Sequence, residues 1–495
     1  MAISSTVFND IPAALRLPGW YIEFDNRLAG NAVFQGKLLV LGQMLEAGSA
    51  TPLVPVRVTR EGQGDELFGR GSMLAEQVRA IKSVDLYTET WAIPMLDAEL
   101  AVAATGAITV TAGPSETRPL ALYIAGYRVW CEMVAGAAPV AAAQAIADAI
   151  NAADRLPVTA SIAVGTPTKV DIECRWAGET GNSISLAECL KGEERTAGLA
   201  LTLAEPTGGA VNPDLLTAVA AMGNEWWNWL CLPYTDATSL EVIEAALNSR
   251  YGPMRQMGGR AFAAFRGSHA ATATLGNGRN SPHVSIMGMG ASPSAPWVWA
   301  ATNAIVAAKA LAIDPARPLQ RLPMPGLIGP REDLRWDDPE RNLLLFDGIA
   351  TYTVATDGTV QIEMQITTYQ RNSAGVADDS YLLINTPETL ERIRYEQRST
   401  FAQKYPRHKL AEDADRLLYD PSQPVMTPKV CKAELLSLYL QTFMGERAWV
   451  RDYPGYKESL QCGIDPDNPN RLNVIDQPML IGQYSVHAQQ TQFRR

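Results

Sequence analysis

The most regular alternation of apolar and polar residues in the chain lies within positions 343–370. Its second half alternates strictly, as a β-strand with one buried face does. The apolar positions of this arm are Val360, Ile362, Met364 and Ile366, and the polar ones are Gln361, Glu363, Gln365 and Thr367. An earlier arm carries Ala350, Tyr352 and Val354 on one face. The stretch therefore predicts a β-hairpin whose apolar face needs a helix or further strands to cover it.

The length of the hairpin loop decides which residues of the two arms face each other. A two-residue loop would pair Val354 with the polar Gln361. A three-residue loop over 356–358 pairs Val354 with Val360 and places Gly358 where a left-handed residue closes a bulge. We predict the three-residue loop.

The first 96 residues predict an N-terminal arm followed by an α/β layer. Prolines interrupt segment 1–20, so we expect it to be extended. The continuous apolar run 37–41 predicts a buried strand. Apolar residues recurring every three or four positions predict a helix at 72–83, and 84–93 predicts another strand. Strand, helix and strand in this order indicate the first part of an α/β domain over 21–96.

Small residues and glycine dominate positions 97–210, which predict an inserted outer α+β domain. An alanine-rich helix is expected at 139–153. The expected strands of this module are 107–111, 120–124, 127–134, 158–164, 169–176, 182–186 and 199–203. The module has enough apolar residues for a core of its own.

Positions 211–322 return to alternating helices and strands and predict an α/β domain that continues the core. The expected helices are 215–222, 240–249 and 297–311, and the expected strands are 226–232, 261–265 and 283–287. Thr238 and Glu241 have the spacing of a capping box at the start of the second helix. Positions 276–278 predict a surface turn.

Positions 323–470 predict a C-terminal inner domain that contains the hairpin, helices at 387–405 and 429–449, and a turn-rich passage at 462–469. Positions 471–495 are expected to form an extended C-terminal arm. Apolar residues alternate with polar ones in this arm, at Tyr484, Val486 and Ala488. An extended segment with one apolar edge needs a sheet to join.

Composition and charge exclude several classes of protein. At 495 residues the chain exceeds one hydrophobic core and should divide into roughly three or four domains. It is 47% hydrophobic and 19% charged, as globular proteins are. Its net charge of −11 argues against nucleic-acid binding. We find no signal-peptide pattern and no run of about 18 apolar residues, so we expect no membrane insertion and a cytoplasm-like compartment.

Motifs that could carry chemistry are incomplete. The six cysteines are widely scattered without a C-x-x-C pair and are expected to be buried, reduced thiols. Gly288-Met289-Gly290 follows an apolar strand, but Pro293 occupies the third position of a dinucleotide loop. Asp465 and Asp467 have the spacing that opens a calcium loop, although an ordinary turn explains them better. We therefore predict no catalytic, cofactor-binding or metal-binding residues and no cofactor.

Three segments carry a resemblance to a known family. FNDIPAALRLPGWYIEFDN, at 8–26, resembles the opening of the tail sheath proteins of Mu-like contractile-tailed phages. LFDGIATYTVATDGTVQIEMQITTYQRN, at 345–372, is similar to the hairpin of that family, and RLNVIDQPMLIGQYSVHAQQTQF, at 471–493, to its C-terminal arm. The glycine-rich insert around 178–182 resembles an outer module of many sheaths. The resemblance covers essentially the whole chain.

The resemblance implies a structural subunit and not an enzyme. In that family, subunits stack as hexameric rings around a tail tube, and contraction drives the tube through the host cell envelope. The partners implied are further copies of the chain, the tube protein, and the baseplate and tail terminator proteins. The implied locations are the phage tail of the virion and, during assembly, the host cytoplasm.

Two groups of residues are candidates for these contacts. Terminal arms that add strands to a neighbouring subunit would use Val7, Phe8, Ile11, Tyr484, Val486, Ala488 and Phe493. The helical segment 388–409 is basic in an otherwise acidic chain, and we hypothesise that it faces an acidic tube. Its basic residues are Arg392, Arg394, Arg398, Lys404, Arg407 and Lys409. A solvated helix with i, i+4 charge pairs explains the same pattern equally well.

Two alternatives remain at this point. An α/β enzyme would place a pocket near Trp226–Thr235 and Gly288–Gly290, although packing of Trp226, Trp227 and Trp229 into the core is favoured. A different structural virion protein, such as a tube or capsid subunit, is the other alternative.

Overall fold

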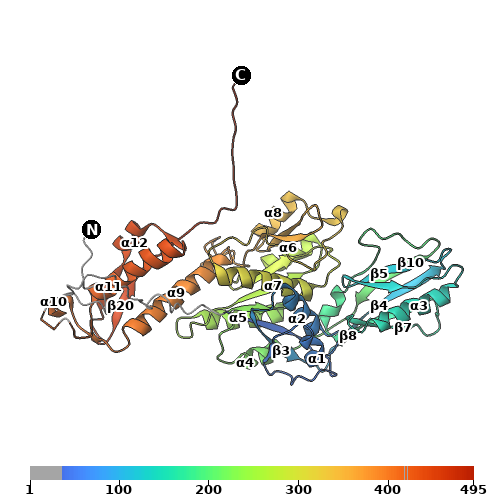
Figure 1. Cartoon of the computed structure of the whole chain (residues 1–495), viewed down its shortest axis with the longest axis horizontal. Helices are drawn as coiled ribbons and strands as arrows, with labels where there is room; N and C mark the ends of the chain where they lie inside the picture. The colour runs from blue at the N-terminus through green and yellow to red at the C-terminus, as the bar shows by residue number, and fades with distance from the viewer. Residues whose placement is uncertain (1–35, 417, 421, 495) are drawn as a thin grey trace, which may run out of the picture. The chain divides into compact units, whose positions relative to one another are not determined.

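A six-stranded, mostly parallel β-sheet joins segments from the first hundred residues to segments from the middle of the chain (Figure 1). The computed structural model describes residues 36–416, 418–420 and 422–494. The strand order is β13-β12-β11-β1-β3-β2, and all neighbours are parallel except β2 at one edge. The strands are β1 (Lys37–Gln43), β2 (Val56–Val58), β3 (Glu89–Met95), β11 (Trp229–Cys231), β12 (Arg260–Phe265) and β13 (Val284–Gly288). The predicted apolar run at 37–41 is confirmed as the buried strand β1.

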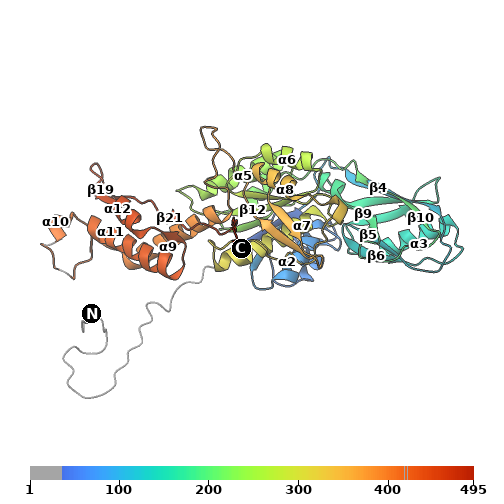
Figure 2. The same cartoon turned by 90° about the horizontal axis from the view of Figure 1, so that it is seen from above.

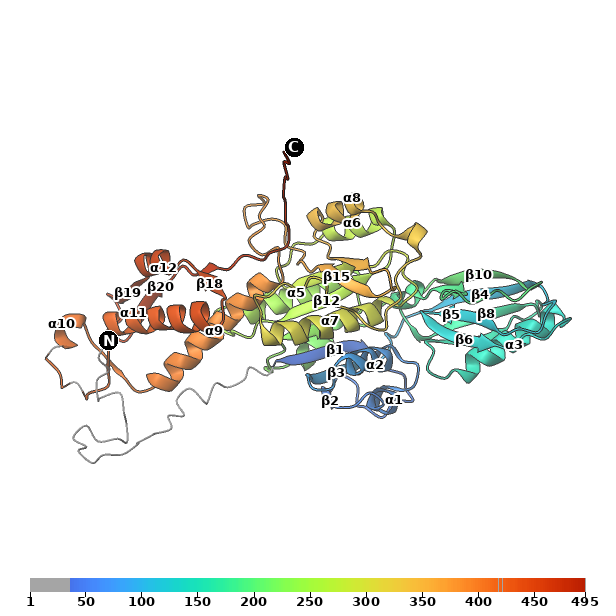
Figure 3. The same ribbon diagram turned by 45° about the horizontal axis from the view of Figure 1, so that its top comes forward.

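Helix α2 (Met73–Val84) and helix α7 (Pro296–Ile313) pack against each other and against this sheet (Figure 3). By length and composition α7 could cross a membrane, yet 78% of it is buried in this structure. It is therefore a core helix. The sequence predicts no segment that could cross a membrane, because Thr302, Asn303 and Lys309 interrupt the apolar run. The mean hydropathy of the helix is nevertheless high enough for a membrane span, which corrects that expectation. The other helices of this domain are α1 (Gln63–Phe68), α4 (Leu215–Ala221), α5 (Ala237–Tyr251) and α6 (His269–Asn277).

The predicted capping box at Thr238 is wrong. Helix α5 begins at Ala237, and the Asp236 side chain accepts a hydrogen bond from Ser239 N at 2.9 Å. Asp236 lies two residues before Thr238 and accepts a hydrogen bond from a free amide of the first turn. The helix therefore starts earlier than predicted. The predicted surface turn at 276–278 is the end of α6, where Gly276 is buried against the main chain of Asp347.

The predicted strand at 84–93 starts five residues later, at Glu89. Helix α2 continues through Val84, and the Asp85 carboxylate then accepts a hydrogen bond from Thr88 N at 2.8 Å. This side-chain bond forms a turn, which competes with extended structure.

The inserted domain has the predicted α+β composition, with two sheets and the helix α3 (Pro139–Ala152). The larger sheet, in the order β10-β4-β8-β7, contains β4 (Ala103–Ala112), β7 (Val158–Ile162), β8 (Lys169–Ala177) and β10 (Ala200–Thr207). The smaller sheet, in the order β6-β5-β9, contains β5 (Leu120–Ile124), β6 (Tyr127–Cys131) and β9 (Leu186–Glu188). The predicted strand at 182–186 is wrong, because the 3-10 helix η2 (Glu179–Ser183) occupies its first two residues and strand β9 begins only at Leu186.

The predicted hairpin register is confirmed. In strands β14 (Thr351–Val354) and β15 (Val360–Met364), Val354 faces Val360 and Tyr352 faces Ile362. Ala355 N bonds to Thr359 O at 2.9 Å, and Gly358 has a φ of 85°. A three-residue loop with a left-handed glycine therefore closes the hairpin.

The segments flanking the hairpin differ from the prediction. Positions 343–346 belong to helix α8 (Asp338–Phe346), which a capping box between Asp337 and Glu340 opens. After β15 the chain joins β13: Thr368 N bonds to Val284 O at 2.9 Å, and Gln365 Nε2 donates to Ser285 Oγ at 2.7 Å. Gln365 and Thr367, expected to face solvent, are therefore buried.

The helices α9, α11 and α12 of the C-terminal part lie near one another (Figure 2), and aromatic side chains form much of the core between them. Its helices are α9 (Asn385–Lys404), α10 (Asp413–Arg416), α11 (Pro428–Ser437), which continues as the π-helix η4 (Leu438–Glu446), and α12 (Tyr453–Ser459). Its strands pair as β16 (Lys409–Leu410) with β17 (Val425–Met426), β18 (Val450–Arg451) with β21 (Met479–Leu480), and β19 (Gln461–Ile464) with β20 (Leu472–Ile475). The passage predicted as turns only is thus partly a hairpin, whose turn the Asp465 carboxylate stabilises by accepting from Asp467 N at 3.0 Å.

A buried carboxylic acid lies between the two core helices. Glu76 of α2 is fully buried, and Trp297 Nε1 of α7 donates to its Oε2 at 2.5 Å. Burial raises the pKa of Glu76 to about 8, although the Trp297 hydrogen bond and the charge of Arg79 partly oppose this shift. The side chain is therefore mostly protonated at neutral pH.

We expect Glu76→Gln to remove part of the pH dependence of stability. Between the ordinary pKa of 4.5 and about 8 the folded state binds the Glu76 proton and the unfolded state does not. This group alone therefore lowers the free energy of unfolding by about 1.4 kcal/mol per pH unit as pH rises through that window. Urea unfolding at pH 5 and pH 8 measures the free energy of unfolding of both proteins. Relative to the wild type, this free energy should be higher for the variant at pH 8 than at pH 5. The exposed Glu46→Gln is the control, and parallel pH curves for wild type and Glu76→Gln would contradict this assignment.

Candidate assembly surfaces

The positions at which the enzyme alternative would place a pocket border two small cavities, of about 170 Å³ at Gly288 and about 230 Å³ at Pro233 and Thr235. The indole of Trp336 covers Gly288 and Gly290, with ring atoms 3.1 and 3.5 Å from where their Cβ atoms would be. Trp227 and Trp229 are buried, which confirms the prediction that they pack into the core. Trp226 is only half-buried, and its Nε1 donates to Gly258 O at 2.7 Å. In the described part of the chain, no group of three or more histidine, cysteine or acidic side chains is arranged to hold a metal ion.

The C-terminal segment 482–494 projects from the chain (Figure 1). Tyr484, Val486 and Phe493 expose 74%, 83% and 85% of their surface, and Ala488 is exposed as well. Within the described residues, this segment makes one hydrogen bond between main-chain atoms, from Ser485 N to Gln483 O. Large apolar side chains at this exposure are unusual in a stable monomer surface and mark a contact region when they are contiguous.

The predicted arm is longer than the unpaired segment. Residues 472–475 and 479–480 already pair with strands β19 and β18 of the same chain. The predicted start at 471 is therefore too early, because a turn at 465–471 folds this stretch back onto β19. The segment without a strand partner of its own begins at Gly482.

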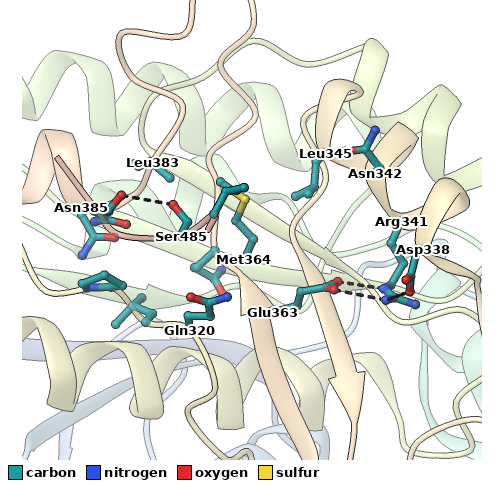
Figure 4. A pocket seen from close by; sticks show the side chains of 15 residues that line it. Gln320, Asp338, Arg341, Asn342, Leu345, Glu363, Met364, Leu383, Asn385 and Ser485 are labelled. Atoms are coloured by element: carbon teal, nitrogen blue, oxygen red, sulfur yellow. Dashed lines mark hydrogen bonds and ion pairs between the residues drawn. The ribbon is translucent and has the colours of Figure 1, made fainter. Parts of the chain in front are cut away.

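A cleft of about 340 Å³ lies between the β14–β15 hairpin and the first residues of the C-terminal segment 482–494 (Figure 4). Its walls come from α8, β15, the start of α9 and Gln483, Ser485 and Val486 of the segment. Arg341 forms its charged side, where its Nε donates to Glu363 at 2.9 Å and its Nη2 to Asp338 at 2.6 Å. The base of the segment thus lies against a surface formed by the hairpin.

Helix α9 divides into a buried half and an exposed half. In the buried half, Glu388 lies 3.7 Å from the guanidinium of Arg260, and both side chains are buried. His283 Nδ1 is 3.3 Å from the same guanidinium. Burial, followed by the charges of Arg260 and Arg394, lowers the pKa of His283 to about 2, so this imidazole is neutral at physiological pH. The ring of Tyr251 lies between Arg260 and Arg394 at 5.5 and 4.6 Å.

The structure changes the predicted basic surface of this helix. Arg392 is only 5% exposed and donates to Ala312 O at 3.3 Å, so it cannot face a partner. Arg394 is half-buried and donates to Tyr251 O at 2.8 Å. The helix ends at Lys404, close to the predicted end at 405, so the basic segment 388–409 continues beyond it, and Lys409 lies in β16. The exposed basic side chains are Arg398, Lys404, Arg407 and Lys409.

The sequence missed this division because 3.6-residue periodicity is weak in α9. Buried Glu388 and Arg392 look like surface residues, and only Ile393 and a few small side chains indicate a packed face. The other predicted arm residues, Val7, Phe8 and Ile11, lie outside the described residues.

An α/β and α+β chain whose segment 482–494 exposes large apolar side chains has a feature of proteins that associate with partners. A family model of the phage tail sheath protein central domain matches residues 208–368, from before β11 to the end of the hairpin region. The Mu-like prophage FluMu tail sheath protein of Haemophilus influenzae is 40% identical over 493 residues, which are 99% of each chain. The chain belongs to the phage tail sheath protein family, whose members are structural proteins and not enzymes.

The solved structures to which this chain is similar include the sheath tail proteins of Desulfitobacterium hafniense and Listeria innocua. They are 12% and 10% identical to this chain, with TM-scores of 0.47 and 0.45. The alignments cover 94% and 90% of this chain, and 100% and 95% of those chains.

We expect Glu388→Ala to destabilise the protein by about 3–5 kcal/mol, because Arg260 would remain buried without its acidic partner. Urea unfolding followed by tryptophan fluorescence measures the loss. Gln403→Ala, an exposed site in the same helix, controls for helix propensity and should change stability by less than about 0.5 kcal/mol. Equal effects of the two substitutions would show that the buried pair does not hold α9 in place.

Proposed function

We propose that this chain polymerises as stacked hexameric rings around a tail tube, and that contraction of the array drives the tube through the host cell envelope. The observation that carries the proposal is the exposed segment 482–494, whose apolar residues alternate and have no sheet partner in their own chain. The 40% identity to a tail sheath protein supports the same function. The partners are other copies, the tube protein, and the baseplate and terminator proteins. Assembly takes place in the host cytoplasm, and the product is part of the virion.

Strand addition gives the link between subunits a physical form. An extended segment that pairs with a neighbour's sheet gains main-chain hydrogen bonds worth roughly 0.5–1.5 kcal/mol each. A few such bonds per arm hold neighbours together while the folded domains change their relative orientation. Head-to-tail contacts of this kind propagate along an array and do not close after two subunits.

Contraction requires that the extended array be higher in free energy than the contracted one and separated from it by a barrier. Each subunit then needs a stiff body and a compliant connection. The buried pair Arg260–Glu388 and the hairpin bonded to β13 support a stiff body. Residues from Gly482 onward support a compliant connection, since they make few internal hydrogen bonds among the described residues.

We further propose that the exposed basic side chains of the α9 region face the tube. Arg398 lies 5.9 Å from the Trp226 ring, and Lys404 Nζ donates to Glu434 at 2.5 Å, so part of this charge is already used within the subunit. Arg407 and Lys409 are exposed on the connection after α9. An acidic tube surface is the complementary partner.

We expect deletion of Gly482–Arg495 to leave a folded monomer that no longer polymerises. Negative-stain microscopy detects polymers, and circular dichroism confirms folding. A sharper pair of variants separates the two faces of the arm: Tyr484→Asp with Val486→Asp should abolish polymers, whereas Ser485→Asp with His487→Asp should retain them. Normal sheaths from the truncated chain would contradict the arm assignment.

We expect Arg398→Glu with Arg407→Glu to weaken assembly on the tube while leaving the fold intact. Sedimentation with purified tube protein measures the association, and raising the salt concentration should weaken the wild-type complex in the same direction. Arg60→Glu with Arg331→Glu, two exposed sites in other domains, is the charge-matched control. Unchanged association of the α9 variant would remove the tube-facing proposal without affecting the arm assignment.

A further inference from the structure

Two cysteines that are 31 positions apart in the sequence meet in the C-terminal core. Cys431 of α11 is 3% exposed and belongs to the buried cluster of this domain. Cys462 of β19 is partly exposed and packs against the same cluster. The two thiols lie close enough that each shifts the pKa of the other, and the elements that carry them, α11 and β19, pack against each other. The remaining cysteines, at 131, 174, 189 and 231, lie in other domains.

We propose that Cys431 and Cys462 are a redox-active pair that forms an intramolecular disulfide when the folded chain meets a low-molecular-weight disulfide such as oxidised glutathione. The two cysteines belong to the same core and lie on elements that pack against each other, which meets the first requirement of such a bond, proximity. The helix α11 and the strand β19 pack closely, so the bond needs no rearrangement of the backbone topology.

Exposure assigns a different role to each cysteine. Cys462 is the more accessible thiol. Burial raises its pKa, although the neighbouring Cys431 and the charge of Lys432 partly oppose this shift. Cys431 is buried in apolar surroundings, which raise the pKa of its thiol to about 12. Cys462 is therefore the attacking sulfur, and Cys431 is the resolving sulfur.

The exchange balances in two steps. The Cys462 thiolate attacks one sulfur of the small disulfide RSSR, forms a mixed disulfide and releases RS⁻. The Cys431 thiolate then attacks the Cys462 sulfur and releases a second RS⁻. The two cysteines lose two protons and two electrons in total, and RSSR takes them up to become two molecules of RSH.

The position of the bond gives it a consequence for the arm. It would join α11 to the β19–β20 hairpin, and β20 leads directly to β21 and then to the segment 482–494. A covalent link here restricts the part of the chain from which the arm starts. This consequence rests on the proposed function: a particle assembled in a reducing cytoplasm would acquire the bond only after release.

The test uses the purified full-length chain, incubated with oxidised glutathione and analysed by intact mass. We expect a species that has lost two hydrogens, and a tryptic peptide pair that links Cys431 to Cys462 and separates with dithiothreitol. The rate should rise with pH, since the thiolate is the reacting form. Cys431→Ser should stop at a glutathione adduct on Cys462, and Cys462→Ser should form no disulfide at Cys431.

The partly exposed Cys189 is the internal control, because it should carry at most a glutathione adduct. A glutathione adduct that persists on Cys462 of the wild type would overturn the proposal. So would the absence of the linked peptides under conditions that oxidise the urea-unfolded chain. The chemistry is measured on unassembled subunits, so a failure of both reduced and oxidised protein to polymerise would count against the proposed function alone.

Discussion

Main-chain hydrogen bonding along the β13 edge of the parallel sheet is the constraint on which the rest of the structure depends. Ala350 N bonds to Ile286 O at 2.9 Å, and Gly288 N bonds to Ala350 O at 3.1 Å. These bonds attach the hairpin and everything after it to a sheet that starts with β1. Unpaired polar groups at a buried sheet edge are costly, so this edge specifies where the C-terminal half joins the core.

Buried polar contacts fix the orientation of the next element. The first half of α9 is held by Arg260 and Glu388, and Asn385 Nδ2 donates to Pro315 O at 2.8 Å. A buried charge pair adds little net stability compared with an apolar contact, but it strongly penalises any other alignment of the helix. The second half of α9 and the helices that follow then build the aromatic core around Tyr439 and Tyr456.

A subunit of an array needs strong bonds within itself and repeatable bonds to its neighbours. This chain separates the two requirements. The apolar side chains of α2, α7 and the sheet are buried within one subunit, whereas Tyr484, Val486 and Phe493 remain exposed at the end of the chain. Leaving such side chains in water is unfavourable, and contact with another copy removes that cost. The family relationship and the exposed segment therefore both favour a protein that associates with other copies of itself.

Local patterns in the sequence determined the hairpin register, the buried strand β1 and the limits of α2, because each depends on residues a few positions apart. Only the tertiary structure decided which distant residues meet. The alternation of apolar and polar residues in this strand predicts that the Gln365 side chain faces solvent, yet pairing with β13 buries it. Arg392 has the chemistry of a surface residue and is buried against Ala312 O. The sequence spacing of Cys431 and Cys462 does not show that they lie close together. Their proximity comes from the packing of α11 on β19, which depends on the whole aromatic core.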